Sequence, residues 1–400
     1  MEFSFNEEER IFQESASEFL KRELRPIARK IDEEKRIPMD FIKKFASQGY
    51  LGLLNSPKLG GAGATLKMAA ILAEEVGKND ISLATAVFYL LNTAWSYILE
   101  KYGKADVVEE IIPRLVRGDA FVGICSTEPQ GGSDVASIKT VAKKIDSKYV
   151  LEGEKIYISE VREILDNDGG LLTLVKTRPE FKHKGISMIF LPLKKVKNFE
   201  VSYLDNMGRM GISTSILRFK GTEVEERYLI GEENRGFYYA MEGFVTARIL
   251  VAASCIGAAE SVLERGMEYI KNRNAFGMPL AKYEGIQFPL VDLYSKLEAI
   301  KLLVFKAAWL YDEMRNGRAS YREVTKYSAM SKLLAPKLAI EVMEEVMTWL
   351  GGYGYTKEAG IEMALRGVLS YYVGAEGAAN IMRIIVGREL LGSEFVPYKE

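Results

Sequence analysis

One short segment gathers hydroxyl groups, carboxylates and turn-forming residues in a single stretch. Residues 125–134 read Cys-Ser-Thr-Glu-Pro-Gln-Gly-Gly-Ser-Asp. A loop of this kind can offer hydroxyls and backbone N–H groups to a polar, planar ligand. A Pro/Gly turn between two strands is the simpler interpretation. The segment by itself leaves both interpretations open.

Two other glycine clusters do not fit the common nucleotide-binding patterns. The cluster at residues 60–63 lacks the Gly-Lys-Ser/Thr that completes a phosphate-binding loop. The cluster at residues 351–354 follows a helical pattern rather than a strand, which argues against a dinucleotide fingerprint. A helix end with glycine in a left-handed cap is expected there.

The rare residues exclude several kinds of catalysis. His183 is the only histidine and lies in a charged segment that is typical of a solvated turn. Ser-His-Asp and Cys-His hydrolysis and a histidine-rich metal site are therefore not expected, and we predict no metal site. Cys125 and Cys255 each lie in an apolar stretch, so buried free thiols are expected rather than a disulfide framework.

The charge balance argues against nucleic acid and membrane partners. The 54 basic and 55 acidic side chains leave a formal charge of −1, so no general attraction to polyanions is expected. The longest apolar runs, such as residues 250–259, are short for a membrane span. The N-terminal residues show no targeting pattern. A cytoplasmic protein is expected.

The predicted secondary structure that must position these residues changes twice along the chain, from helices to strands and back to helices. Helical spacing of apolar residues dominates residues 1–120, where Asn6 is a candidate N-cap and 39–47, 66–76 and 82–102 are predicted helices. Residues 121–235 contain short runs rich in Val, Ile, Tyr and Thr. No long helix separates these runs, so the predicted strands are antiparallel.

Long helices are predicted after Gly236. The ranges 238–272, 283–316, 321–350 and 380–391 show apolar residues three and four positions apart. Such helices in succession predict an up-down four-helix bundle over residues 236–400. The predicted fold is α+β, multidomain and mostly α.

The chain resembles the FAD-dependent acyl-CoA dehydrogenases over nearly its whole length. Five motifs stand in the family's order, and each would be weak evidence alone. They lie at residues 125–134, at 152–159 (Glu-Gly-Glu-Lys-Ile-Tyr-Ile-Ser), at 273–277 with Gln287 beyond, at 351–354 and at 376–383 (Glu-Gly-Ala-Ala-Asn-Ile-Met-Arg).

The resemblance implies α,β-dehydrogenation of an acyl-CoA thioester. In that reaction a carboxylate removes the α-proton while the β-hydrogen leaves as hydride to flavin N5. By resemblance the base is Glu376, whose backbone N–H helps to hold the thioester oxygen. Without the resemblance, a solvated acid near the last helix is the simpler interpretation. Some family members place the base on the first long C-terminal helix, where this chain has Ala247.

The resemblance also implies the ligand contacts. The cofactor-binding residues it implies are Cys125, Thr127, Tyr157, Ser159, Arg273, Phe276, Gln287, Gly351, Gly352 and Gly354. The substrate-binding residues it implies are Ser133, Phe244, Arg248 and Gly377. A surface salt bridge is the alternative for Arg248. In the family the glycine cluster and the Arg273 motif serve the neighbouring subunit's FAD, so a homo-oligomer, dimer or tetramer, is expected.

Several positions depart from the family pattern, and these departures affect the expected recognition of the acyl-CoA. Val245, Met210 and Ile216 stand where charged residues are common, and Thr348 stands where many members have Gln. The depth of the acyl pocket is expected to depend on side chains around Tyr89, Leu90, Phe244 and Tyr372.

Three rival functions remain at this point. A flavin-dependent oxidase or monooxygenase of the same superfamily would not need Glu376. A decarboxylating dehydrogenase would need an added cation, which the sequence does not locate. A non-enzymatic flavoprotein scaffold would be expected to have a basic surface. For a dehydrogenase, an electron-transfer flavoprotein is the expected electron acceptor.

Overall fold

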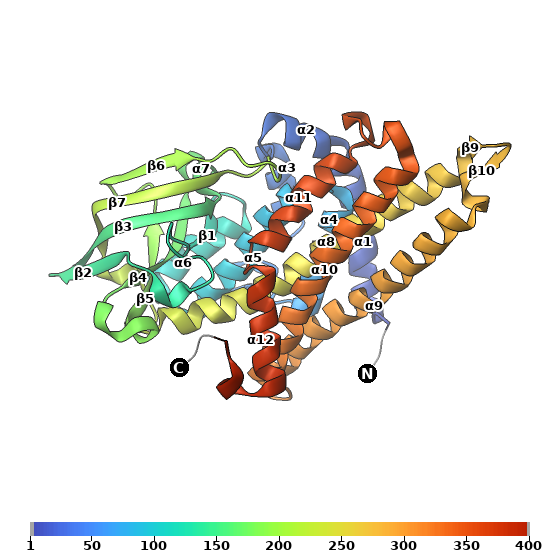
Figure 1. Cartoon of the computed structure of the whole chain (residues 1–400). Helices are drawn as coiled ribbons and strands as arrows, with labels where there is room; N and C mark the ends of the chain where they lie inside the picture. The colour runs from blue at the N-terminus through green and yellow to red at the C-terminus, as the bar shows by residue number, and fades with distance from the viewer. Residues whose placement is uncertain (1–3, 398–400) are drawn as a thin grey trace.

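The computed structural model describes residues 4–397 and places a β domain at one end of a body of helices (Figure 1). Residues 1–3, part of the segment judged to lack a targeting pattern, lie outside the described residues. The N-terminal helices are α1 (Glu7–Glu23), α2 (Ala28–Glu34), α3 (Met39–Ser47), α4 (Leu66–Asn79), α5 (Ala84–Tyr102) and α6 (Ala105–Val116).

Local sequence explains where the first helix begins. The Asn6 side chain accepts a hydrogen bond from the Glu9 N–H at 2.8 Å, and the Glu9 carboxylate accepts one from the Asn6 N–H at 3.0 Å. This capping box satisfies two N–H groups at the helix start, and it confirms the predicted Asn6 cap. Lys67 on α4 contacts the same Glu9 carboxylate at 2.7 Å, which ties α1 to α4.

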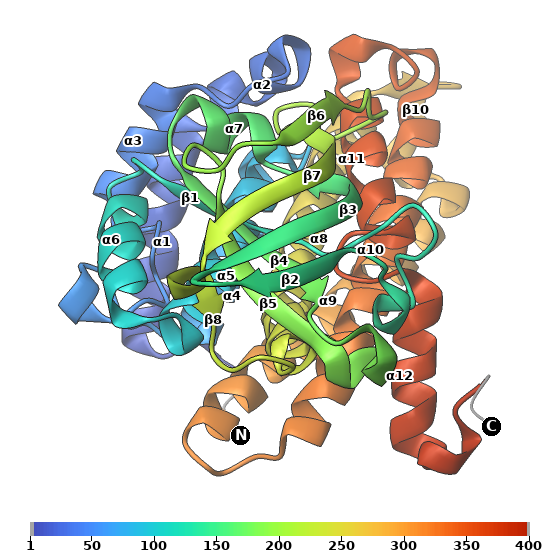
Figure 2. The same ribbon diagram turned by 90° about the vertical axis from the view of Figure 1, so that its left-hand side faces the viewer.

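The middle of the chain forms one large sheet (Figure 2). Its strands are β1 (Phe121–Cys125), β2 (Val141–Ile145), β3 (Lys148–Ser159), β4 (Gly169–Lys176), β5 (Ile186–Pro192), β6 (Phe199–Tyr203), β7 (Thr214–Glu225) and β8 (Leu229–Ile230), with α7 (Val161–Asp166) between β3 and β4. The path β6-β7-β3-β2-β4-β5-β8 is mostly antiparallel, as predicted. The prediction is wrong for β1, which pairs with β4 in parallel, and for one parallel residue pair between β2 and β4.

The C-terminal part consists of long helices packed around α8 and α10. Its elements are α8 (Gly236–Asn272), a small hairpin of β9 (Asn274–Ala275) and β10 (Met278–Pro279), α9 (Glu284–Arg315), α10 (Tyr321–Leu350), α11 (Ile361–Val373) and α12 (Ala379–Leu391). The long helices of this part follow the sequence prediction, and α11 was missed. The predicted domain boundaries stay a prediction.

Helix α8 joins the β domain to the bundle. It begins against β5, where a Cβ on Gly236 would lie 2.3 Å from the Met188 nitrogen, and it extends to the β9–β10 hairpin at the far end (Figure 1). By length and composition alone α8 could cross a membrane, a property that the shorter apolar runs did not suggest. However, 94% of its most apolar window is buried inside the protein, as in the core helix of a bundle.

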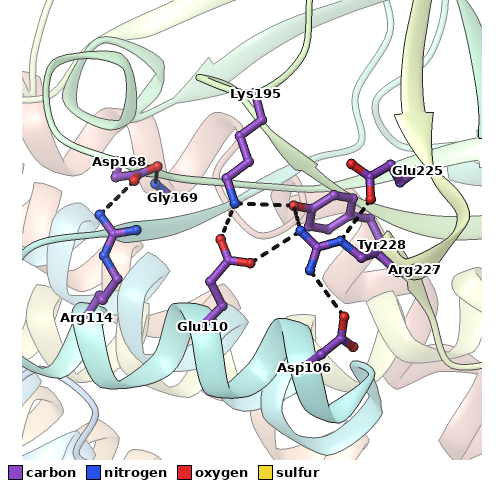
Figure 3. A network of polar contacts seen from close by, with 9 residues as sticks. All are labelled: Asp106, Glu110, Arg114, Asp168, Gly169, Lys195, Glu225, Arg227 and Tyr228. Carbon is purple, nitrogen blue, oxygen red and sulfur yellow. Dashed lines mark hydrogen bonds and ion pairs between the residues drawn. The ribbon is translucent and has the colours of Figure 1, made fainter.

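A polar network fixes α6 to the edge of the β domain (Figure 3). Arg227 contacts Asp106 at 3.2 Å, Glu110 at 3.4 Å and Glu225 at 3.1 Å. Its guanidinium also lies 4.4 Å from the centroid of the Tyr228 ring. Further along α6, Arg114 pairs with Asp168 at 2.7 Å (Figure 3). The network holds the N-terminal helices and the β domain in a fixed relation, and both contribute walls to the cavity described next.

Candidate active site

The three parts of the chain enclose a cavity of about 810 Å³. The N-terminal part contributes Val87, Leu90 and Leu91 of α5. The β domain contributes residues of the 126–136 loop, of β3 and of the segment before β7. The bundle contributes Met241, Phe244 and Arg248 of α8, residues 370–378, and Ile381 and Ile385 of α12. The cavity is therefore mainly apolar, with a few polar side chains in its walls, as expected for a ligand site.

Glu376 lines this cavity on the segment between α11 and α12. Its φ of 60° is unusual for a residue other than glycine. Burial raises the pKa of its carboxyl to about 7, against the opposing effect of Arg248, Lys332 and Arg209. Within residues 4–397, the carboxylate has no hydrogen-bond partner. A carboxyl in this state can accept a proton near neutral pH.

Two buried cations bind the backbone carbonyls of Glu376 and of the residue that follows it. Arg248 donates from Nε to the Glu376 carbonyl at 2.9 Å, and Lys332 on α10 donates from Nζ to the Gly377 carbonyl. Arg248 is only 5% exposed and forms no ion pair within the described part of the chain. The alternative of a surface salt bridge is therefore wrong. The structure instead gives Arg248 a role in positioning Glu376, alongside the predicted substrate contact.

A buried ion pair shapes the 125–134 loop. Lys155 of β3 is fully buried and contacts Glu128 at 2.9 Å and the Ser126 carbonyl at 3.1 Å. Glu128 also accepts hydrogen bonds from the N–H groups of Lys139 and Thr140. Although burial raises the pKa of Glu128, these donors together lower it to about 2. The pair fixes the loop so that Thr127 and Ser133 face the cavity.

A bulge in β3 exposes groups suited to a planar ligand. Lys155 pairs with Leu217 and Ile158 with Ser215, so two residues of β3 oppose one of β7. Within the bulge Tyr157 has a φ of 61° and is 65% exposed at the cavity wall. In the described chain, no partner is found for the Thr127 and Ser159 hydroxyls, which also line the cavity. An aromatic face beside free hydroxyls fits the isoalloxazine ring of a flavin.

The other predicted cofactor residues lie elsewhere. Cys125 is fully buried and does not line the cavity, so its side chain belongs to the core, and burial raises the pKa of its thiol to about 12. Arg273, Phe276, Gln287 and the glycines at 351–354 also lie outside the cavity, near the β9–β10 hairpin. Tyr269 of α8 stacks on Tyr353, which brings these two motifs to the same end of the bundle.

Sequence reasoning missed part of the cavity wall. Leu90 and Phe244 line the cavity as expected, whereas Tyr89 and Tyr372 do not, and Tyr371 takes the place of Tyr372. Gly377, also predicted to contact substrate, lies in the wall beside Glu376. Arg209 and Lys332 were not considered as site residues. Both lie near Glu376 only because the fold brings together segments that are far apart in sequence. No local sequence pattern identifies either residue as part of the site.

Comparison with known proteins identifies the family. The model of the acyl-CoA dehydrogenase N-terminal domain matches residues 6–119, that of the middle domain residues 123–222, and that of the C-terminal domain residues 234–391. The chain belongs to the acyl-CoA dehydrogenase family. It is an oxidoreductase that acts on CH–CH bonds, and its cofactor is FAD.

Similar proteins differ in their stated roles. Acryloyl-CoA reductase (NADH) of Anaerotignum propionicum is 33% identical, with 98% of this chain and 96% of the relative covered. Butyryl-CoA dehydrogenase of Megasphaera elsdenii has a TM-score of 0.89 and 28% identity, with 98% of this chain and 100% of that chain covered. A chain described with the electron transferring flavoprotein of Acidaminococcus fermentans has a TM-score of 0.90 and 29% identity over 98% of this chain and 100% of that one.

Proposed function

We propose that the protein oxidises an acyl-CoA thioester to its 2,3-enoyl-CoA, with Glu376 as the base. The observation that carries this proposal is the Glu376 carboxyl. It lies in an apolar cavity with its pKa raised to about 7, and the same cavity is lined by hydroxyls that suit a flavin ring. A monooxygenase of the same superfamily would have no use for this base, whereas a thioester oxidase would use it and would differ in passing the electrons to O2.

In this reaction, the side chain of Glu376 and the backbone near it have separate roles. Glu376 takes the α-proton, and the β-hydrogen leaves with both electrons of its bond. Bound FAD supplies the acceptor for that hydride. Within residues 4–397 the backbone N–H groups of Glu376 and Gly377 have no carbonyl partner, so they are available for the thioester oxygen. Hydrogen bonds to that oxygen stabilise the negative charge that develops as the α-proton leaves.

The test replaces the base without changing its shape. The Glu376→Gln variant should bind FAD normally. Reduction of its FAD by acyl-CoA should be on the order of 100- to 10,000-fold slower than in the wild type, which is the usual contribution of a general base. Glu362→Gln is a matched control, because Glu362 of α11 pairs with Arg366 outside the cavity. Full activity of Glu376→Gln on the best substrate would overturn the proposal.

The electron acceptor and the oligomeric state belong to the same proposal. Each turnover leaves two electrons on the enzyme, and we propose that an electron-transfer flavoprotein removes them, since a similar solved chain is described with such a protein. We also propose a homo-oligomer, because Phe276 at the hairpin tip is fully exposed and α9 exposes Phe288 and Val291. Light scattering would measure the oligomer. Reoxidation of the reduced enzyme by a purified electron-transfer flavoprotein would test the acceptor.

A further inference from the structure

A cationic side chain lies in the cavity wall without a partner. Arg209 belongs to the segment between β6 and β7 and lines the same cavity as Glu376. Its Nε is shielded from solvent and has no hydrogen-bond partner. Over residues 4–397, no ion pair involves its guanidinium either. Its Cζ lies 5.7 Å from the centroid of the Tyr371 ring, and its charge lowers the pKa of Glu376.

Two other charged side chains of the cavity wall have partners. Glu128 is paired with Lys155, and Arg248 donates to the Glu376 carbonyl. Of the two arginines among the described residues that line the cavity, Arg248 uses its Nε on the backbone at Glu376, whereas the Arg209 Nε has no acceptor and is available for a ligand. Burial lowers the pKa of its guanidinium, against the opposing effect of Tyr371 and Glu376.

The backbone holds Arg209 firmly in this position. Its φ of 55° lies in the left-handed region, which is unfavourable for an arginine. On one side a Cβ on Gly208 would lie 2.3 Å from the Arg366 carbonyl, and Arg366 donates to the Met207 carbonyl at 2.7 Å. On the other side the Ile37 N–H donates to the Gly211 carbonyl at 3.2 Å. The segment is thus clamped against α11 and the α2–α3 region.

An unpaired cation in the cavity wall discriminates between substrates. A purely apolar acyl group would remove the remaining water from Arg209 and offer nothing in exchange, which is unfavourable. A carboxylate on the acyl group would replace that water with a charge-assisted hydrogen bond. A guanidinium group can bind a carboxylate through two parallel hydrogen bonds, in bidentate geometry.

We propose that Arg209 is a specificity-determining residue that binds a carboxylate at the far end of the acyl group. The substrate class is then the mono-CoA esters of dicarboxylic acids. This inference rests on the proposed dehydrogenation and names its substrate. It also supplies the cation that a carboxylate-bearing substrate requires, which the sequence alone did not locate.

The experiment compares acyl-CoA pairs that differ only at the far end. Succinyl-CoA is paired with butyryl-CoA, glutaryl-CoA with pentanoyl-CoA, and adipyl-CoA with hexanoyl-CoA. The measurement is kcat/KM for anaerobic flavin reduction by the FAD-loaded protein. We expect the wild type to prefer the carboxylate member of at least one pair. The comparison is made well above the pKa of Glu376, because the Arg209 charge also lowers that pKa. There Arg209→Met should lower kcat/KM for the carboxylate member by about 100-fold, as for loss of a buried charge partner, and should lower that of its methyl partner far less.

Two further variants keep the test decisive. Arg209→Lys retains the charge and should restore part of the preference. Arg218→Met removes an arginine of β7 that pairs with Glu154 of β3. Both residues lie outside the cavity, so this variant should have no effect on the preference. FAD content is measured for each variant, which separates a folding defect from a change of specificity.

The outcomes distinguish this inference from the proposed function. A wild type that oxidises the methyl members as well as or better than the carboxylate members at every length would overturn the role of Arg209 and leave the dehydrogenase proposal intact. An equal fall for both members of a pair in Arg209→Met would also overturn it. A wild type that oxidises no acyl-CoA would instead overturn the proposed function.

Discussion

Glu376 is subject to opposing influences on its protonation. Burial raises the pKa of its carboxyl to about 7, and the cations of Arg248, Lys332 and Arg209 limit that rise. A general base is most effective when its pKa lies near the working pH, because it is then both ionised and basic enough to take a proton. The cavity therefore sets this carboxyl in the useful range by its own packing and charges.

The pH dependence of the reaction follows from this value. Only the ionised carboxylate takes a proton, so kcat/KM should fall about tenfold for each pH unit below the pKa of about 7 and level off above it. Anaerobic flavin reduction measured across neutral pH checks this. A rate that stays constant down to the ordinary pKa of a glutamate would show that the carboxyl is solvated in the free enzyme.

The sequence predicts some residues of the site and not others. Thr127, Tyr157 and Ser159 belong to motifs that are continuous in sequence, and their side chains all reach the cavity. No sequence motif marks Arg209, because its position depends on contacts between residues 208 and 366. Cys125 belongs to the first motif but points into the core, because successive residues of a strand face opposite sides.

At the scale of elements, the buried pair of Lys155 and Glu128 joins β3 to the 125–134 loop. A charge that is buried without its partner is strongly destabilising. The pair therefore determines both the stability of this corner and the position of the Thr127 hydroxyl.

Removal of one partner should reveal this coupling. Lys155→Met should lower the free energy of unfolding by about 3–5 kcal/mol, because Glu128 is left buried without a counter-charge. Urea denaturation of the FAD-loaded protein measures the change. The double variant Lys155→Met with Glu128→Gln should recover part of the loss. A double variant no more stable than the single one would show that the charge is not the cause.

The elements that sequence reasoning missed have physical explanations. Helix α11 contains Gly367, a poor helix former, but a Cβ there would lie 2.2 Å from the Ser82 carbonyl. Close packing on the N-terminal part therefore requires the glycine and stabilises the helix. Helix α6 contains Pro113, which argues against a helix locally. The parallel pairing of β1 with β4 depends on strands far apart in sequence.

At the scale of the whole molecule, the cavity exists only where the three parts meet. The Arg227 network between α6 and the β domain is one of the contacts that fix their relation (Figure 3). Its ion pairs are partly exposed, so each contributes little alone, and the stacking on Tyr228 adds to them.

Loss of Arg227 should therefore have a modest, salt-dependent effect. Arg227→Ala should lower the free energy of unfolding by about 1–2 kcal/mol at low ionic strength and by less in high salt. Thermal denaturation at two salt concentrations measures this. A loss that does not change with salt would assign the effect to packing on Tyr228 rather than to the ion pairs.

The central claim is that Glu376 and a flavin together oxidise an acyl-CoA in this cavity. The most direct measurement is the visible spectrum of the purified FAD-loaded protein before and after anaerobic addition of a panel of acyl-CoAs. We expect at least one acyl-CoA to bleach the flavin of the wild type, and the same acyl-CoA to bleach the flavin of Glu376→Gln far more slowly. A flavin untouched by every acyl-CoA, but bleached by another reductant and rapidly reoxidised by air, would overturn the role of Glu376 and favour an oxidase or monooxygenase that acts on another substrate.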